Sequence, residues 1–110
     1  MAYDEALADD VRALLGGEPG LTEKKMFGGL AFLVNGNMAV AASGQGGLLV
    51  RCDPAQTDDL VDDEHVGRME MRGRAMDGWL RVDTDAVSTE AGLATWVDVG
   101  LGYARTLPPK

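Results

Sequence analysis

A chain of 110 residues is long enough for one domain with a single core, so we expect residues 1–110 to form one domain. The 45% hydrophobic and 25% charged residues exclude wholesale disorder, and the net charge of −8 argues against direct binding to nucleic acid through a basic surface. The single cysteine excludes an intrachain disulfide and suits a reducing compartment. Without a basic leader or a long apolar run, a cytoplasmic protein with no membrane span is expected.

The first predicted element is a helix over residues 3–15. Apolar side chains recur there at helical spacing, and the acids Asp4 and Glu5 at its start suit the positive end of the helix dipole. Gly16 and Gly17 end this helix, and Pro19 indicates a loop after it.

Residues 24–52 are the most strand-like part of the chain. Asn35-Gly36 lies between the apolar runs 30–34 and 38–42, and this dipeptide favours the positive φ angles of a type I′ hairpin turn. A second glycine-rich turn over residues 44–47 precedes the apolar residues 48–50. Gly28-Gly29 predicts a bulge or a tight bend. We therefore expect three or four consecutive antiparallel strands.

The second half of the chain predicts a helix, two strands and a final helix. Asp53-Pro54 is typical of a helix start, and a short acidic helix would run to about residue 62. Alternating polarity over residues 66–72 and 76–82 predicts two half-buried strands. Ser88 is the expected N-cap of a helix ending near Arg105, in which Gly100 would allow close approach to the sheet. The fold class is α+β, with one antiparallel sheet, helices mainly on one face, and the order α-β-β-β(-β)-α-β-β-α.

The charge is divided between the elements. Residues 24–52 carry three bases and no acid, whereas residues 53–64 carry six acids and no base. If the alternate residues Leu48 and Val50 face the core, then a second set of side chains points away from the helices. A tryptophan among arginines is typical of interface hot spots, although the same side chains could simply form cross-strand pairs on a solvated face. The candidate partner face consists of Leu49, Arg51, Arg68, Arg72, Trp79 and Arg81.

No catalytic, cofactor-binding or metal-binding residue is assigned from the sequence. One histidine and one cysteine cannot supply a Cys/His metal site within the chain. Cys52 is expected to be a small buried hydrophobic residue, and the acids at 62–64 are expected to raise the pKa of His65 and keep it charged. The acids over residues 58–64 lack the spacing of a calcium loop, so a solvated helix face is expected there. The glycine-rich turns match no phosphate-binding motif.

Several short motifs give the chain a resemblance to a known family. Lys25-Met26-Phe27-Gly28-Gly29, then Gly36-Asn37-Met38, then Leu49-Val50-Arg51, then Met76-Asp77-Gly78-Trp79 and finally Trp96-Val97 resemble the N-terminal domain of TfoX/Sxy proteins. The resemblance implies an α-β-β-β-α-β-β-α fold similar to secretion-chaperone-like folds, in a bacterial protein. The residues it marks as structural are Met26, Phe27, Gly28, Gly29, Gly36, Asn37, Met38 and Gly78.

The resemblance also implies a class of function. The founding members of the family carry a further C-terminal domain and act as positive regulators of natural-competence genes, together with a cyclic-AMP-responsive transcription activator. We expect this chain to be a stand-alone N-terminal module without that second domain. The leading hypothesis is a non-enzymatic regulatory or protein-interaction module that forms a homodimer or binds another protein. The alternative is a small-anion-binding protein or enzyme that uses the sheet-face arginines near the Gly28-Gly29 bend.

Overall fold

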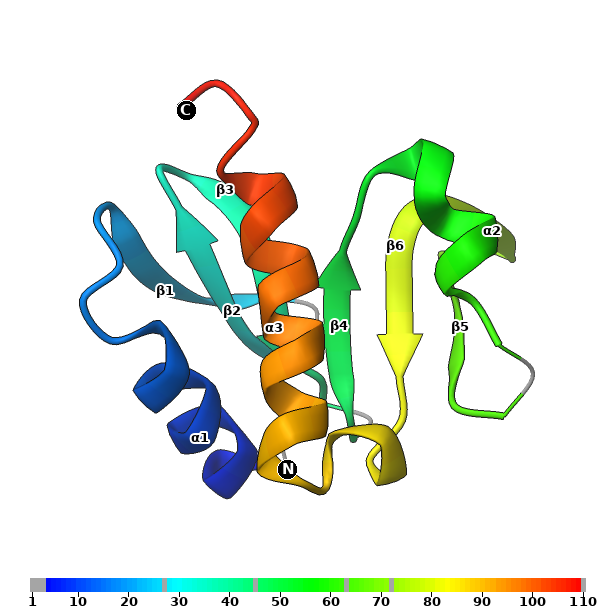
Figure 1. Cartoon of the computed structure of the whole chain (residues 1–110), viewed down its shortest axis with the longest axis horizontal. Coiled ribbons are helices and arrows are strands. Elements are labelled where there is room, and N and C mark those ends of the chain that lie inside the picture. The colour runs from blue at the N-terminus through cyan, green and yellow to red at the C-terminus, as the bar shows by residue number, and fades with distance from the viewer. Residues whose placement is uncertain (1–3, 27, 45, 63, 72, 110) are drawn as a thin grey trace.

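The computed structural model describes residues 4–26, 28–44, 46–62, 64–71 and 73–109 (Figure 1). The described residues form one six-stranded antiparallel sheet with helices packed against it, which confirms the predicted α+β class. The elements in chain order are α1 (Glu5–Leu15), β1 (Leu21–Met26), β2 (Gly29–Val34), β3 (Asn37–Ala42), β4 (Leu48–Arg51), the 3-10 turn η1 (Pro54–Gln56), α2 (Thr57–Leu60), β5 (Val66–Met71), β6 (Arg74–Val82), the 3-10 turn η2 (Asp85–Val87) and α3 (Glu90–Ala104).

The strand order in the sheet is β1-β2-β3-β4-β6-β5. The first four strands therefore lie side by side in chain order, and β6 rather than β5 pairs with β4. The chain reaches the outer position of β5 through η1 and α2, and then returns along β6. Both edges of the sheet, β1 and β5, are thus formed by the outer strands of hairpins.

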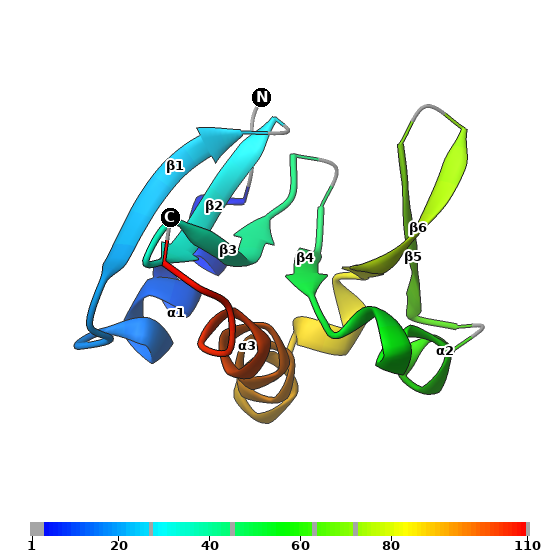
Figure 2. The ribbon, with the colours of Figure 1, turned by 90° about the horizontal axis from the view of Figure 1, so that it is seen from above.

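All the helices lie on one side of the sheet (Figure 2). Helix α3 crosses the middle of the sheet over β3 and β4, and α1 lies beside it (Figure 1). Gly100 permits this contact, because a Cβ atom there would lie 2.3 Å from the carbonyl oxygen of Ala39. The close approach predicted for Gly100 is confirmed. The main core between these layers includes Val11, Leu15, Phe32, Val40, Leu48, Val50, Leu80, Val82, Leu93 and Val97.

The central hairpin has the predicted turn. Asn35 and Gly36 have φ angles of 53° and 85°, the left-handed values that a type I′ turn requires. The next residue, Asn37, is only 2% exposed, and its side-chain amide donates a hydrogen bond to the Pro108 carbonyl oxygen at 2.8 Å. The turn residues therefore also hold the segment that follows α3 against the sheet.

Four element boundaries differ from the prediction. Strand β6 begins at Arg74 rather than at residue 76, because residues 74–76 pair with β5. Strand β1 begins at Leu21, because the whole segment 21–26 pairs with β2 in a continuous antiparallel register. The acidic helix is shorter than predicted and consists of η1 followed by the single turn α2. The N-cap of α3 is Thr89, whose hydroxyl accepts the Gly92 N–H at 3.0 Å, while the Ser88 hydroxyl donates to the Asp85 carbonyl. No described helix is long and apolar enough to cross a membrane.

Candidate functional site

The helix-free face of the sheet contains a second, smaller apolar cluster. It consists of Ala31, Met38, Ala41, Leu49 and Met69, with Leu33 and Trp79 half-buried against it. Figure 2 shows the hairpins β1–β2 and β5–β6 both extending away from the helices, on either side of β3 and β4. These residues are therefore buried by the curvature of the sheet and by neighbouring side chains rather than by a layer of helices. The predicted outward orientation of Leu49 and Trp79 agrees with this arrangement.

Arg51 lies at the point where β3 and β4 separate. The β3–β4 pairing ends at Val40 and Val50, so Arg51 has only β6 beside it, where it stands opposite Trp79. Its guanidinium carbon lies 5.0 Å from the centre of the Trp79 ring and 5.6 Å from that of Tyr103, a residue of α3. Within the described part of the chain, no carboxylate forms an ion pair with Arg51. Its charge is stabilised by two aromatic faces and stays available to an anionic group.

Two other members of the candidate partner face do not join Arg51 and Trp79. Arg68 stands opposite the core residue Leu80, and it forms ion pairs with Asp58 of α2 and with Asp77. Its predicted position on the helix-free face is therefore wrong, since it faces the side that carries α2. Arg72 lies outside the described residues. Arg81 stands opposite Leu49 and belongs to the helix-free face, together with Lys24, which stands opposite Ala31.

The Gly28-Gly29 bend packs against the turn between β3 and β4. A Cβ atom on Gly29 would lie 2.0 Å from the carbonyl oxygen of Ala42, and one on Gly44 would lie 2.2 Å from that of Gly28. Gly28 also has a φ of 73°, which favours glycine. The two turns thus meet backbone to backbone. The neighbouring Phe27 lies outside the described residues.

Gly78 forms the centre of a bulge in β6. Arg68 pairs with Leu80 and Met69 pairs with Met76, so residues 77–79 have no partner on β5. Gly78 has a φ of 86°, its N–H donates to the Thr57 hydroxyl at 2.7 Å, and its carbonyl accepts the Cys52 N–H at 2.9 Å. The bulge therefore anchors the segment after β4 and brings Trp79 beside Arg51.

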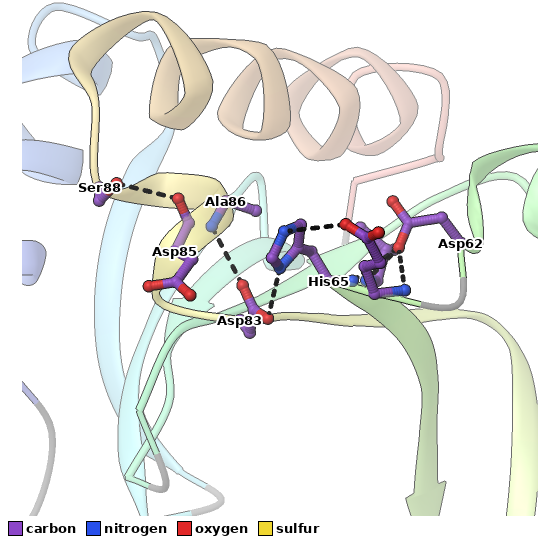
Figure 3. Close-up of polar contacts among 8 residues, drawn as sticks. Asp62, His65, Asp83, Asp85, Ala86 and Ser88 are labelled. Carbon is purple, nitrogen blue, oxygen red and sulfur yellow. Dashed lines mark hydrogen bonds and ion pairs between the residues drawn. The ribbon is translucent and has the colours of Figure 1, made fainter.

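Cys52 and His65 are far from forming a nucleophile–base pair. Cys52 is buried, burial raises the pKa of its thiol, and its sulfur lies 3.9 Å from the Thr57 hydroxyl oxygen. His65 lies instead at the opposite end of β6, and its Nδ1 is 2.8 Å from Oδ2 of Asp83 (Figure 3). The pKa of His65 is raised as predicted, but the hydrogen bond to Asp83 is the main cause and the acids before His65 contribute less.

The sequence comparison identifies the fold family. Residues 13–104 match the model of the TfoX N-terminal domain. The chain belongs to the TfoX N-terminal domain family. No curated protein matches the chain, and no solved structure does.

The signature residues of the TfoX N-terminal domain have structural roles in this chain. The MFGG motif contributes the Gly28-Gly29 bend, which meets the β3–β4 turn. The GNM motif contributes Gly36 of the hairpin turn and the Asn37 amide that holds the segment after α3. Met38 contributes to the apolar cluster on the helix-free face, and Gly78 forms the β6 bulge. In a TfoX N-terminal domain of this kind, the signature thus shapes the helix-free face as well as the fold.

Two clefts lie on the helix-bearing side of the molecule. One, of about 510 Å³, lies between η1, α2 and α3, and the other, of about 300 Å³, lies between α1 and the start of α3. Neither of these two clefts is lined by an arginine from the described residues. Arg68 forms its ion pairs with Asp58 and Asp77, whereas Arg51 lies between Trp79 and Tyr103. Arg51 and the Gly28-Gly29 bend lie at opposite ends of the β3–β4 hairpin. The described arginines of the small-anion alternative therefore do not converge near the Gly28-Gly29 bend.

Three residues of these sites were not predicted from the sequence. Thr57 and Tyr103 reach their partners through tertiary packing, and Asp83 reaches His65 across the β5–β6 hairpin. Only the position of Asp83 could have been inferred from the sequence. Residues 66–71 and 74–82 form a hairpin that pairs Val66 with Val82, so the next residues outward, His65 and Asp83, lie opposite each other.

Proposed function

We propose that this chain is a non-enzymatic regulatory module that acts by binding another protein through its helix-free face. Membership of the TfoX N-terminal domain family supports a regulatory role. The observation that carries the proposal is the pairing of Trp79 with Arg51, an aromatic ring and a cation that lacks a carboxylate partner among the described residues. Tryptophan and arginine are the residues most enriched among interface hot spots.

The charge of the face defines the chemistry of the partner. Lys24 and Arg81 lie on the helix-free face of a chain whose net charge is −8, and the Arg51 guanidinium lies at the border of that face, between Trp79 and Tyr103 of α3. Complementary potentials favour an acidic partner surface, whereas the like charges of two identical faces repel each other. A homodimer in which these faces meet would therefore become tighter as salt screens the arginines, while binding to an acidic partner would become weaker.

The helix-free face exposes little apolar surface to a partner, because most of its apolar cluster is buried. Leu14 of α1, at 39%, is the large hydrophobic residue that the described part of the chain exposes most, and it lies on the helix-bearing side. The helix-free face therefore offers a small aromatic and cationic anchor beside an apolar cluster that is largely buried. Such a surface suits a regulatory contact that forms and dissociates more than a permanent, largely apolar interface.

The experiment is an affinity capture from the native cell with three immobilised variants compared with the wild type. Trp79→Ala and Arg51→Gln each alter the helix-free face, and Leu14→Ala is the matched control on the other side. We expect the captured proteins to be lost with the first two variants and retained with the control, after circular dichroism has shown that all three fold. Equal capture by all variants, or loss with Leu14→Ala alone, would contradict the proposal.

Light scattering after size exclusion distinguishes a second copy of this chain from an acidic protein of another kind as the partner. The wild type is run at about 20 mM and about 500 mM salt, concentrations that bracket strong and weak screening of surface charge. A dimer that strengthens with salt and is lost in Trp79→Ala would identify a second copy of the chain as the partner. A monomer at both concentrations would leave an acidic protein of another kind as the partner that the proposal requires.

A further inference from the structure

A group of three side chains converges at the end of β6, away from the Trp79–Arg51 pair. The β5–β6 register pairs Val66 with Val82, so His65 and Asp83 form the next pair along the hairpin. The backbone extends this pairing, because the Asp83 N–H donates to the His65 carbonyl at 2.9 Å. The 3-10 turn η2 follows at once and brings Asp85 to the same place. Three separate pieces of local structure therefore place one imidazole and two carboxylates together.

The donor atoms of these three residues lie close to one another. One ligand atom from each of His65, Asp83 and Asp85 lies within 4.8 Å of the other two. His65 Nδ1 and Asp83 Oδ2 are already 2.8 Å apart, and Figure 3 shows these side chains pointing toward one another with Asp85 beside them. Ligand atoms bonded to a divalent ion at about 2.1 Å lie about 3 Å from one another, so binding of one ion by all three requires the Asp85 carboxylate to move closer to the His65–Asp83 pair.

The surrounding contacts hold two of the three ligands in place. Oδ1 of Asp83 accepts the Ala86 N–H at 3.0 Å, which leaves Oδ2 directed at His65. Oδ1 of Asp62 accepts the N–H groups of residues 64, 65 and 66, at 2.8, 2.6 and 3.1 Å, and so fixes the loop that carries the imidazole. Such outer contacts are what orient the ligands of metal sites in proteins.

Asp85 is the member of the group that the fold itself does not use. Within the described part of the chain, its carboxylate pairs with no cation, whereas its main-chain carbonyl accepts the Ser88 hydroxyl at 2.9 Å. A fold that needed only the His65–Asp83 pair would not require a second carboxylate beside it.

We propose that His65, Asp83 and Asp85 bind one divalent transition-metal ion, with Zn²⁺ as the probe. The imidazole nitrogen selects this class, since Mg²⁺ and Ca²⁺ prefer oxygen ligands alone. Three protein ligands leave further positions to water. The bound ion joins the start of β5 to η2, the segment that leads into α3. The site shares no residue with the helix-free face, so the test of metal binding is independent of the test of the proposed function.

The test is isothermal titration of the tag-free chain with Zn²⁺, with Asp85→Asn as the decisive variant. This variant keeps the His65–Asp83 hydrogen bond and removes only the carboxylate that the fold does not use. We expect one ion per wild-type chain, with affinity reduced at least about tenfold in Asp85→Asn and by more in His65→Gln. Asp59→Asn is the matched control, because it removes the same charge from an exposed position on α2, and we expect it to bind like the wild type.

A second measurement reads the imidazole directly. His65 is the single histidine of the chain, so a spectrum of histidine ring nitrogens contains one residue. Zn²⁺ should shift its Nδ1 resonance in the wild type and in Asp59→Asn, and Mg²⁺ at the same concentration should not. Four results would overturn the proposal: no Zn²⁺ binding up to about 1 mM, equal affinity in Asp85→Asn and the wild type, equal weakening in both aspartate variants, or equal shifts with Mg²⁺.

Discussion

The two faces of the sheet are buried in different ways, and two neighbouring residues of β4 show the contrast. Leu48 is 1% exposed and belongs to the core beneath α1 and α3. Leu49 is 4% exposed, yet its neighbours are the half-buried Trp79 and the residues of a helix-free face. Burial of Leu48 comes from a complete second layer. Burial of Leu49 comes from a curved sheet and from side chains that also contact solvent.

This difference separates the residues that hold the fold together from those that are free to contact a partner. A core between two layers cannot change without loss of stability. The helix-free face, by contrast, carries Arg51 and Trp79 in an arrangement that a partner can complete. We therefore expect substitutions on the first face to act mainly on the free energy of unfolding and those on the second face to act mainly on binding.

The largest expected effect comes from truncating the two leucines. Leu48→Ala should lower the free energy of unfolding by about 3–4 kcal/mol, because the layers on both sides cannot collapse into the cavity. Leu49→Ala should cost about 2 kcal/mol, since the partly exposed side chains around it can move inward. Urea unfolding of both variants measures the difference. Equal losses would show that the helix-free face is packed as rigidly as the main core.

A pair of glycines in α3 tests the contact between helix and sheet. Gly100→Ala should lower the free energy of unfolding by about 2 kcal/mol, because the new methyl group would meet the Ala39 carbonyl oxygen at 2.3 Å. Gly102→Ala should instead raise it by about 0.5–1 kcal/mol, since nothing described lies within 4 Å of the added atom and alanine favours the helix. Thermal unfolding followed by circular dichroism checks both signs, and a gain in stability for Gly100→Ala would contradict the close packing.

On the helix-free face, a smaller effect on stability is expected. Arg51→Gln removes a cation from two aromatic faces, and we expect a loss of about 1 kcal/mol in the free energy of unfolding. Arg74→Gln is a matched control, because Arg74 is exposed and pairs with no carboxylate among the described residues. Urea unfolding of the two variants should separate them. A loss above about 3 kcal/mol for Arg51→Gln would mean that this face is mainly structural.

The smallest expected effect is a pH dependence on the helix-bearing side. Arg12 of α1 donates two hydrogen bonds to Glu23 of β1, at 2.7 and 2.8 Å, and these lower the pKa of Glu23 from its ordinary value of 4.5. A lowered folded-state pKa contributes stability above about pH 4.5 that is lost as the pH falls through the folded value. Compared with the wild type, Arg12→Gln should therefore lower the urea midpoint at pH 7. Near pH 3, where Glu23 becomes protonated, the same substitution should lower the midpoint by less.

The control for this prediction is again the removal of a charge that has no carboxylate partner among the residues the structure describes. Arg74→Gln changes the net charge by the same amount and should shift the urea midpoint little at either pH. If Arg12→Gln and Arg74→Gln gave the same pH dependence, general charge repulsion rather than the contact between α1 and β1 would be responsible.

The local features of the fold could be predicted, and the long-range ones could not. Asn35-Gly36 encodes its turn through backbone conformation alone, and the alternation along residues 48–50 assigns Leu48 and Leu49 to opposite faces. Arg68 was placed on the wrong face because the alternation along residues 66–72 was interpreted with Met69 toward the core. Met69 belongs instead to the apolar cluster on the helix-free face, so Arg68 shares the helix-bearing side with Val66. The contact of Arg51 with Tyr103 depends on how α3 packs, which no local pattern encodes.

Site-specific photo-crosslinking in the native cell tests the central claim most directly, namely that the helix-free face is the surface that contacts a protein. Benzoylphenylalanine replaces Leu33, which is half-buried on the helix-free face, and in a second strain it replaces Leu14 of α1. The account predicts a discrete crosslinked adduct from position 33 and none from position 14. Adducts from position 14 alone would contradict it and would assign the contact to the helices.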